Sequence, residues 1–90
     1  MLLYLHGLHA TPHPQKVDAL VRLGWSVHAP HIDYQTPGVW RRIIDGLDSA
    51  LKDSGEELQW VVGSSMGGYV GEAVARQRGV PMLSFNPALP

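Results

Sequence analysis

One stretch near the middle of the chain indicates the fold most clearly: Trp60-Val61-Val62-Gly63-Ser64-Ser65-Met66-Gly67-Gly68-Tyr69. An apolar run ends at Gly63 and a segment of helical period begins at Met66, so the pattern predicts a strand that turns sharply into a helix. Gly63-x-Ser65-x-Gly67 falls at this junction. Such a turn needs glycine two residues before and two residues after the serine, because side chains there would collide.

Short apolar runs alternate with longer segments of helical period on both sides of this turn. We expect strands at residues 2–5, 25–29, 58–62 and 81–85, and helices at about 14–23, 37–54 and 66–78. This alternation is typical of βαβ units. It predicts an α/β fold of three layers, with a parallel sheet of about four strands and helices on both faces, in a single domain that covers residues 1–90.

The helices carry their own signals. Thr36 followed by Pro37 is typical of an N-cap and a first helical residue, and Gly55 is well placed to end that helix. Gly68 and Gly71 would let the last helix lie close to the sheet. The remaining apolar positions are expected to pack in the interior: Val17, Leu20 and Val21 in the first helix, Trp40, Ile43, Ile44, Leu47 and Leu51 in the second, and Trp25, Trp60 and Tyr69 elsewhere.

The composition limits the class of protein. The chain is 44% hydrophobic and 17% charged with a net charge of -1, which fits a globular protein and gives no reason to expect nucleic acid or an anionic membrane as partner. The absence of cysteine excludes disulfides, cysteine-based zinc sites and a cysteine nucleophile. No apolar run approaches the roughly 20 residues that span a bilayer, and residues 1–5 lack the basic region of a signal peptide. We expect a cytoplasmic protein without cofactor.

The glycine-flanked turn also predicts chemistry. It would hold Ser65 in a strained backbone conformation, lift its hydroxyl above the sheet, and point the first N–H groups of a helix toward developing negative charge. His6-Gly7-Leu8 follows the first strand, where serine hydrolases place the other half of an oxyanion hole. We predict Ser65 as the nucleophile and the backbone N–H groups of Leu8 and Met66 as oxyanion donors. The residues expected to line this site are His6, Gly7, His9, Gly63 and Gly67.

Three segments give the chain a specific resemblance: LLYLHG at 2–7, VVGSSMGGY at 61–69 and FNPALP at 85–90. Together they resemble the YqiA-like esterases, a small branch of the α/β-hydrolase superfamily. The resemblance covers all 90 residues but only the first half of a typical member. It implies hydrolysis of carboxylic esters of small molecules, with Ser65 as nucleophile. It also implies a sheet in which the first strand lies between the second and third and the fourth lies beyond the third.

The chain departs from that family in its catalytic acid and base. In the superfamily both follow the nucleophile, whereas here Glu72 is the one acidic residue after Ser65 and no histidine follows it. Glu72 lies within the expected helix and should point away from the turn. We therefore expect the acid and histidine of the triad to be missing from this chain. Three helices also leave one face of the sheet partly bare, which predicts a homo-oligomer or a missing C-terminal half, whether a partner or a longer gene product supplies it.

The five histidines all precede Ser65. His6 is expected to brace the loop before Gly7, with a role as general base as the alternative; His9 lies on the same loop and is a further candidate base. His28 is expected to pack or to face outward, and His13 to lie on the surface. A further alternative is that Asp33 and either His31 or His9 form a triad with Ser65, because a triad is defined by its geometry and not by the order of its residues. His6, His9 and His13 lack a helical i, i+4 frame with an acidic partner, so no metal site is predicted.

Two functions remain open from the sequence. The first is an esterase that acts through an acyl-enzyme on Ser65. The alternative is a non-catalytic binding or assembly module that keeps half of the hydrolase fold and binds carboxylates or small anions at the Leu8 and Met66 N–H groups. A nucleotide-binding domain is disfavoured, because neither a Gly-x-Gly-x-x-Gly loop nor a P-loop is present.

Overall fold

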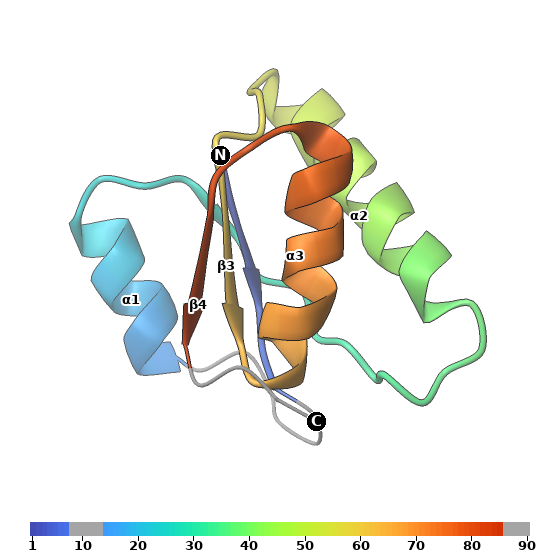
Figure 1. Ribbon diagram of the computed structural model, residues 1–90. Helices are drawn as coiled ribbons and strands as arrows, with labels where there is room; N and C mark the ends of the chain where they lie inside the picture. The colour runs from blue at the N-terminus through green and yellow to red at the C-terminus, as the bar shows by residue number, and fades with distance from the viewer. Residues whose placement is uncertain (8–13, 86–90) are drawn as a thin grey trace.

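A four-stranded sheet whose strands are all parallel forms the centre of the molecule (Figure 1). The computed structural model describes residues 1–7 and 14–85. The elements are, in chain order, β1 (Leu2–Leu5), α1 (Pro14–Arg22), β2 (Val27–His28), α2 (Val39–Ser54), β3 (Trp60–Ser64), α3 (Met66–Arg78) and β4 (Met82–Phe85). The strand order is β2-β1-β3-β4, as the family resemblance implies. The predicted α/β fold is confirmed.

Strand β1 is buried on both of its faces, because helices cover the sheet from two sides. Leu3 and Leu5 pack in a cluster with Ile43 and Leu47 of α2 and with Val74 of α3. The alternate residues Leu2 and Tyr4 pack with Val62 on the opposite face, where Val17 and Leu20 of α1 lie against them. Figure 1 shows the resulting three layers, with α1 on one side of the sheet and α2 and α3 on the other.

Glycine sets the ends of the helices, as the sequence predicts. Gly55 has φ 69° and its N–H donates to the Leu51 carbonyl, which closes α2. Gly79 has φ 66° and its N–H donates to the Ala75 carbonyl, which closes α3. Both residues adopt the left-handed conformation that glycine tolerates best.

Three predicted boundaries were wrong. Helix α2 begins at Val39 and not at Pro37, because Gly38 adopts the left-handed conformation, with φ 75°, and cannot be part of a right-handed helix. The Thr36 N–H donates to the Asp33 carbonyl in a separate turn. Strand β2 covers Val27–His28 rather than 25–29, since the Trp25 N–H still donates to the Leu20 carbonyl at the end of α1. Strand β3 covers 60–64 rather than 58–62, and so reaches the residue before Ser65.

Several residues predicted to be interior are exposed. Val21 is 52% exposed and Tyr69 is 66% exposed, so neither packs in the core. Trp40 and Trp60 are 39% and 37% exposed, whereas Trp25 is half-buried against the α1 side of the sheet. None of the helices in the described part of the chain has the length and apolar character needed to cross a membrane.

Candidate active site

Ser65 occupies the tight turn between β3 and α3, with φ 51° and ψ -117°. It is the one non-glycine residue with positive φ in the described part of the chain. Such a conformation costs on the order of 1–3 kcal/mol and persists only where the surroundings impose it. Here the Ser65 N–H donates to the Phe85 carbonyl at 3.0 Å, and the Ser65 carbonyl accepts the N–H groups of Gly68 and Tyr69 at 3.0 and 3.3 Å. The turn is therefore fixed from both sides.

The two glycines that flank Ser65 are required by close backbone contacts. A Cβ at Gly63 would overlap the Gly67 carbonyl and lie 2.6 Å from the Gly68 Cα. A Cβ at Gly67 would overlap the carbonyl groups of Leu5 and His6. The turn therefore leaves no room for a side chain at either position, as predicted from the spacing.

Helix α3 lies close to the sheet because of two further glycines. A Cβ at Gly68 would lie 2.5 Å from the Ser84 Oγ, and one at Gly71 would lie 2.9 Å from the Met82 Cε. Met66 is the first residue of α3, so its N–H has no acceptor within the helix. This is the position from which an oxyanion donor would act.

The loop after β1 meets the turn at Gly7. A Cβ at Gly7 would lie 3.3 Å from the Ser65 Cβ and 3.7 Å from the Ser65 Oγ. The structure thus brings together His6, Gly7, Ser65 and Met66, which are far apart in the sequence. Leu8, His9 and His13 lie outside the described residues.

His6 is buried, and both of its ring nitrogens form hydrogen bonds. The Ile32 N–H donates to His6 Nε2 at 2.7 Å, so the ring proton is on Nδ1, which donates to the Gly7 carbonyl at 2.7 Å. The Tyr34 hydroxyl donates to the His6 carbonyl at 2.5 Å. Burial raises the pKa of Tyr34 to about 12, and this keeps the donor protonated. His6 therefore holds the Gly7 loop in place and has no free lone pair to take a proton from Ser65.

The other candidates for acid and base that lie within the described residues form no contact with Ser65. His31 is exposed, with its ring 5.5 Å from that of His6. The Asp33 carboxylate accepts from the Gln35 N–H at 3.0 Å. Glu72 is exposed on α3 and pairs with Arg76 at 2.7 Å. Within residues 1–7 and 14–85, no three His, Asp or Glu side chains come together as a metal ion would need.

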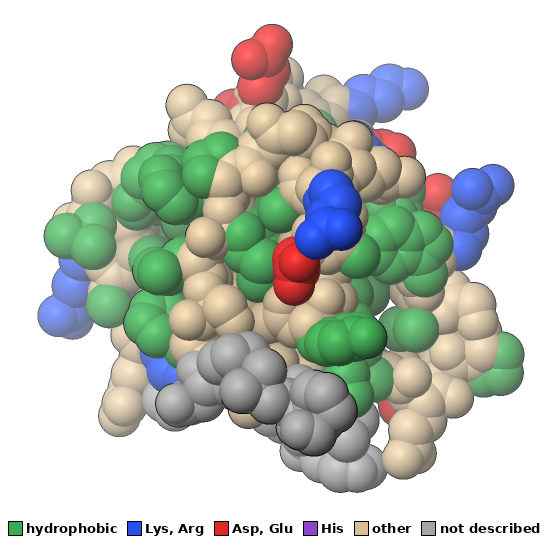
Figure 2. Space-filling view, in the orientation of Figure 1, with side chains coloured by type: hydrophobic (Ala, Val, Ile, Leu, Met, Phe, Trp, Pro, Cys, Tyr) green, Lys and Arg blue, Asp and Glu red, His purple; other side chains and the backbone are tan. Residues whose placement is uncertain are grey.

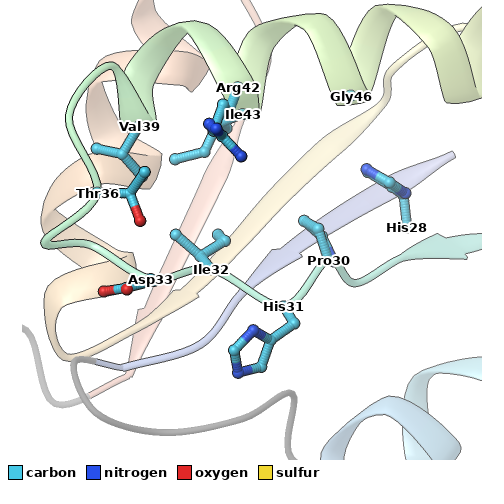
Figure 3. A pocket seen from close by; sticks show the side chains of 10 residues that line it. All are labelled: His28, Pro30, His31, Ile32, Asp33, Thr36, Val39, Arg42, Ile43 and Gly46. Atoms are coloured by element: carbon cyan, nitrogen blue, oxygen red, sulfur yellow. The ribbon is translucent and has the colours of Figure 1, made fainter.

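His28 lines a cavity of about 290 Å³ between α2 and the loop that follows β2. Figure 3 shows its ring directed from the end of β2 toward α2 near Gly46. The Nε2 atom is buried and has no hydrogen-bond partner among the described residues. Burial lowers the pKa of the His28 imidazole below its usual value of 6.5. The cavity is lined by His28, Pro30, His31, Ile32, Asp33, Thr36, Val39, Arg42, Ile43 and Gly46.

Lys16 and Tyr34 contact this site and were not singled out from the sequence. The Lys16 Nζ lies 3.5 Å from the Ser64 Oγ and 5.7 Å from the centre of the Phe85 ring. A signal for Lys16 was present, because it lies four residues before Leu20 and so shares the sheet-facing side of α1. No comparable signal exists for Tyr34, since its partner is the His6 backbone carbonyl.

Comparison with known proteins places the chain in one family. No solved structure matches it. The model of the uncharacterised protein family UPF0227, which is the YqiA-like family, matches residues 1–90. The residues that carry the resemblance, LLYLHG before Ser65 and VVGSSMGGY around it, are the same ones that the fold brings together. The chain belongs to the uncharacterised protein family UPF0227.

Proposed function

We propose that this chain carries the nucleophile of a serine hydrolase of the esterase type, an α/β-hydrolase that acts on carboxylic esters of small molecules. The observation that carries the proposal is the backbone of Ser65, with φ 51° and ψ -117°, between two glycines that admit no side chain. A nucleophile elbow has this arrangement because it exposes the serine hydroxyl at the carboxyl end of the sheet. The Gly7 loop lies against Ser65 and forms the other side of the proposed site.

The proposed reaction follows from these positions. The Ser65 Oγ attacks the ester carbonyl carbon while its proton passes to a general base. The Met66 N–H, together with that of Leu8, would bind the resulting oxyanion. Collapse of the tetrahedral intermediate breaks the ester C–O bond, the alcohol leaves with a proton, and water then hydrolyses the acyl-enzyme.

The base is proposed to come from outside the described residues. Both His6 ring nitrogens are engaged, and no histidine follows Ser65 in the sequence. We propose that a second copy, a partner or a further part of a longer polypeptide supplies the acid and the histidine, with His9 of this chain, which lies outside the described residues, as the alternative base. The same observation favours the alternative function, a non-catalytic module that keeps the elbow and binds a small anion there.

Labelling with a fluorophosphonate probe, read by intact mass, tests the proposal. We expect one adduct on the wild-type chain and none on Ser65→Ala. Ser49→Ala, on the exposed side of α2, is the matched control and should label as the wild type does. If a chain shown to be folded by circular dichroism takes no label, the better interpretation is either the binding module or a chain that lacks the partner or further polypeptide that supplies the base.

A further inference from the structure

The inference concerns Lys16, whose ammonium lies near Ser64, the residue that precedes the candidate nucleophile. Lys16 is partly buried on α1, and its Nζ lies 3.5 Å from the Ser64 Oγ, the residue immediately before Ser65. The same ammonium lies 5.7 Å from the centre of the Phe85 ring. Phe85 pairs with Ser64 in the sheet, and its carbonyl accepts the Ser65 N–H. Lys16 thus contacts two residues next to the turn, Ser64 and Phe85.

No carboxylate side chain of the chain neutralises Lys16. All eight Asp and Glu residues lie within the described residues, because 8–13 and 86–90 contain neither residue type. The ion pairs in the described part of the chain use other cations, namely the N-terminus with Glu56, Arg41 with Asp45, Arg76 with Glu72 and Arg78 with Asp48. The one acid near Lys16 in sequence is Asp18, which at i+2 does not face it on a helix.

Within residues 1–7 and 14–85, the contacts of Lys16 leave much of its hydrogen-bonding capacity unused. An ammonium has three donors, and the long contact to Ser64 engages one of them. The Phe85 ring adds an attraction that has no single acceptor atom. A partly buried ammonium that pairs with no Asp or Glu side chain can form a charge-assisted hydrogen bond with an anionic ligand.

We propose that Lys16 is a specificity-determining residue that binds a carboxylate of the substrate, so that the preferred esters carry a carboxylate in their acyl or alcohol part. This rests on the proposed esterase function of Ser65 and names its substrate class. One ammonium matches the single charge of a carboxylate, whereas a phosphate monoester carries close to two charges at neutral pH. Lys16 binds the substrate and takes no proton in the reaction.

The test is a binding measurement that does not require turnover. The full chain, labelled with ¹⁵N and carrying Ser65→Ala so that neither ester is hydrolysed, is titrated with monomethyl succinate and with the neutral dimethyl succinate, following the amides of residues 64 to 66. The variants at Lys16 and Lys52 are made in this same background. We expect the chain that retains Lys16 to bind the hemiester about tenfold more tightly than the diester, the size of a charge-assisted hydrogen bond at a partly buried site. Lys16→Met should lose this preference while keeping the apolar stem that packs on the sheet.

Two further variants separate charge from packing. Lys16→Arg retains a cation and should retain the preference, and Lys52→Met, at the other lysine of the chain, should leave it unchanged. Equal binding of the two esters by the chain that retains Lys16 would overturn the proposal, even if Lys16→Met did not fold. A preference that survives in Lys16→Met would overturn it as well.

A third ligand tests the class of anion. Tighter binding of monomethyl phosphate than of the hemiester would refute a carboxylate site, and weaker binding would support it. The labelling of Ser65 is measured separately. Hemiester preference without labelling would mean that the anion site stands and the esterase function fails, whereas labelling without preference would mean the reverse.

Discussion

Ser65 shows how a single residue depends on neighbours from three strands. Its positive φ is held by a hydrogen bond to Phe85 of β4, by the glycines at 63 and 67, and by Gly7 after β1. The glycine spacing made the turn predictable, because a collision two residues away is a local matter. The role of His6 remained open in the sequence, because its partners are backbone groups, the Ile32 N–H and the Gly7 carbonyl, which residue types do not specify.

A substitution at Gly67 tests how closely the turn is packed. We expect Gly67→Ala to reduce the free energy of unfolding by about 2 kcal/mol or more, because the added Cβ would overlap the backbone carbonyls of Leu5 and His6, which cannot move aside as a flexible side chain would. Urea unfolding followed by circular dichroism measures this change.

The control is another glycine-to-alanine change within a helix. Gly46 lies inside α2, and the nearest atom to an added Cβ is the His28 Nε2 at 4.0 Å. Gly46→Ala should therefore leave stability unchanged or raise it by up to about 1 kcal/mol, through helix propensity. Equal stability of the two variants would contradict the expected overlap between a Cβ at Gly67 and the backbone carbonyls of Leu5 and His6.

At the scale of elements, predictions succeeded where a local signal acts without competition. The first strand at 2–5 and the last helix at 66–78 have the predicted bounds. The strand is a short apolar run that ends before His6-Gly7, and the helix ends at Gly79, so the pattern allows only one assignment for each. The predicted start of α2 was wrong because Gly38 adopts a left-handed conformation with φ 75°, and the capping propensity of Thr36 and Pro37 does not reveal that break. The prediction that Trp40 is buried was wrong for a related reason. Its position on the apolar stripe of the helix does not show whether the sheet extends beneath it.

The contact between β2 and α2 gives a prediction about pH. Burial lowers the pKa of His28 in the folded chain below the 6.5 of the unfolded chain. The unfolded state therefore binds the proton more readily, so the stabilising effect is complete above about pH 6.5 and is lost as the pH falls through that value toward the lower folded pKa. We expect the free energy of unfolding to decrease between pH 7.5 and 5.

His28→Leu isolates this contribution. It removes a buried ring nitrogen that has no partner among the described residues, so the variant should be at least as stable as the wild type at pH 7.5. Urea unfolding at several pH values should show a smaller loss of stability in acid than the wild type shows. An unchanged loss would mean that His28 is not the group responsible.

At the scale of the whole molecule, the two faces of the sheet are covered unequally. Helices α2 and α3 cover one face, whereas α1 alone covers the other (Figure 1). Leu83 and Phe85 pair with Val62 and Ser64, and Val62 faces α1, so both residues lie on the α1 side of β4. They are 48% and 43% exposed. Figure 2 views the molecule from the β4 edge and shows hydrophobic side chains on both sides of that edge, interspersed with few charged ones.

This bare surface predicts self-association. The outer edge of β4 pairs with no strand in the described part of the chain, and exposed apolar residues next to an open edge favour contact with a second chain. We expect sedimentation velocity to show a dimer or a larger assembly that dissociates on dilution.

Leu83→Lys should weaken the association by roughly 30-fold, because burying a leucine contributes about 2 kcal/mol and the lysine adds a charge to the interface. Trp40→Lys, at a similarly exposed residue of α2, should associate as the wild type does. A wild-type chain that stays monomeric at the highest concentration measured would show that this surface does not bind a second copy, and a second copy would then not be the source of the proposed acid and histidine.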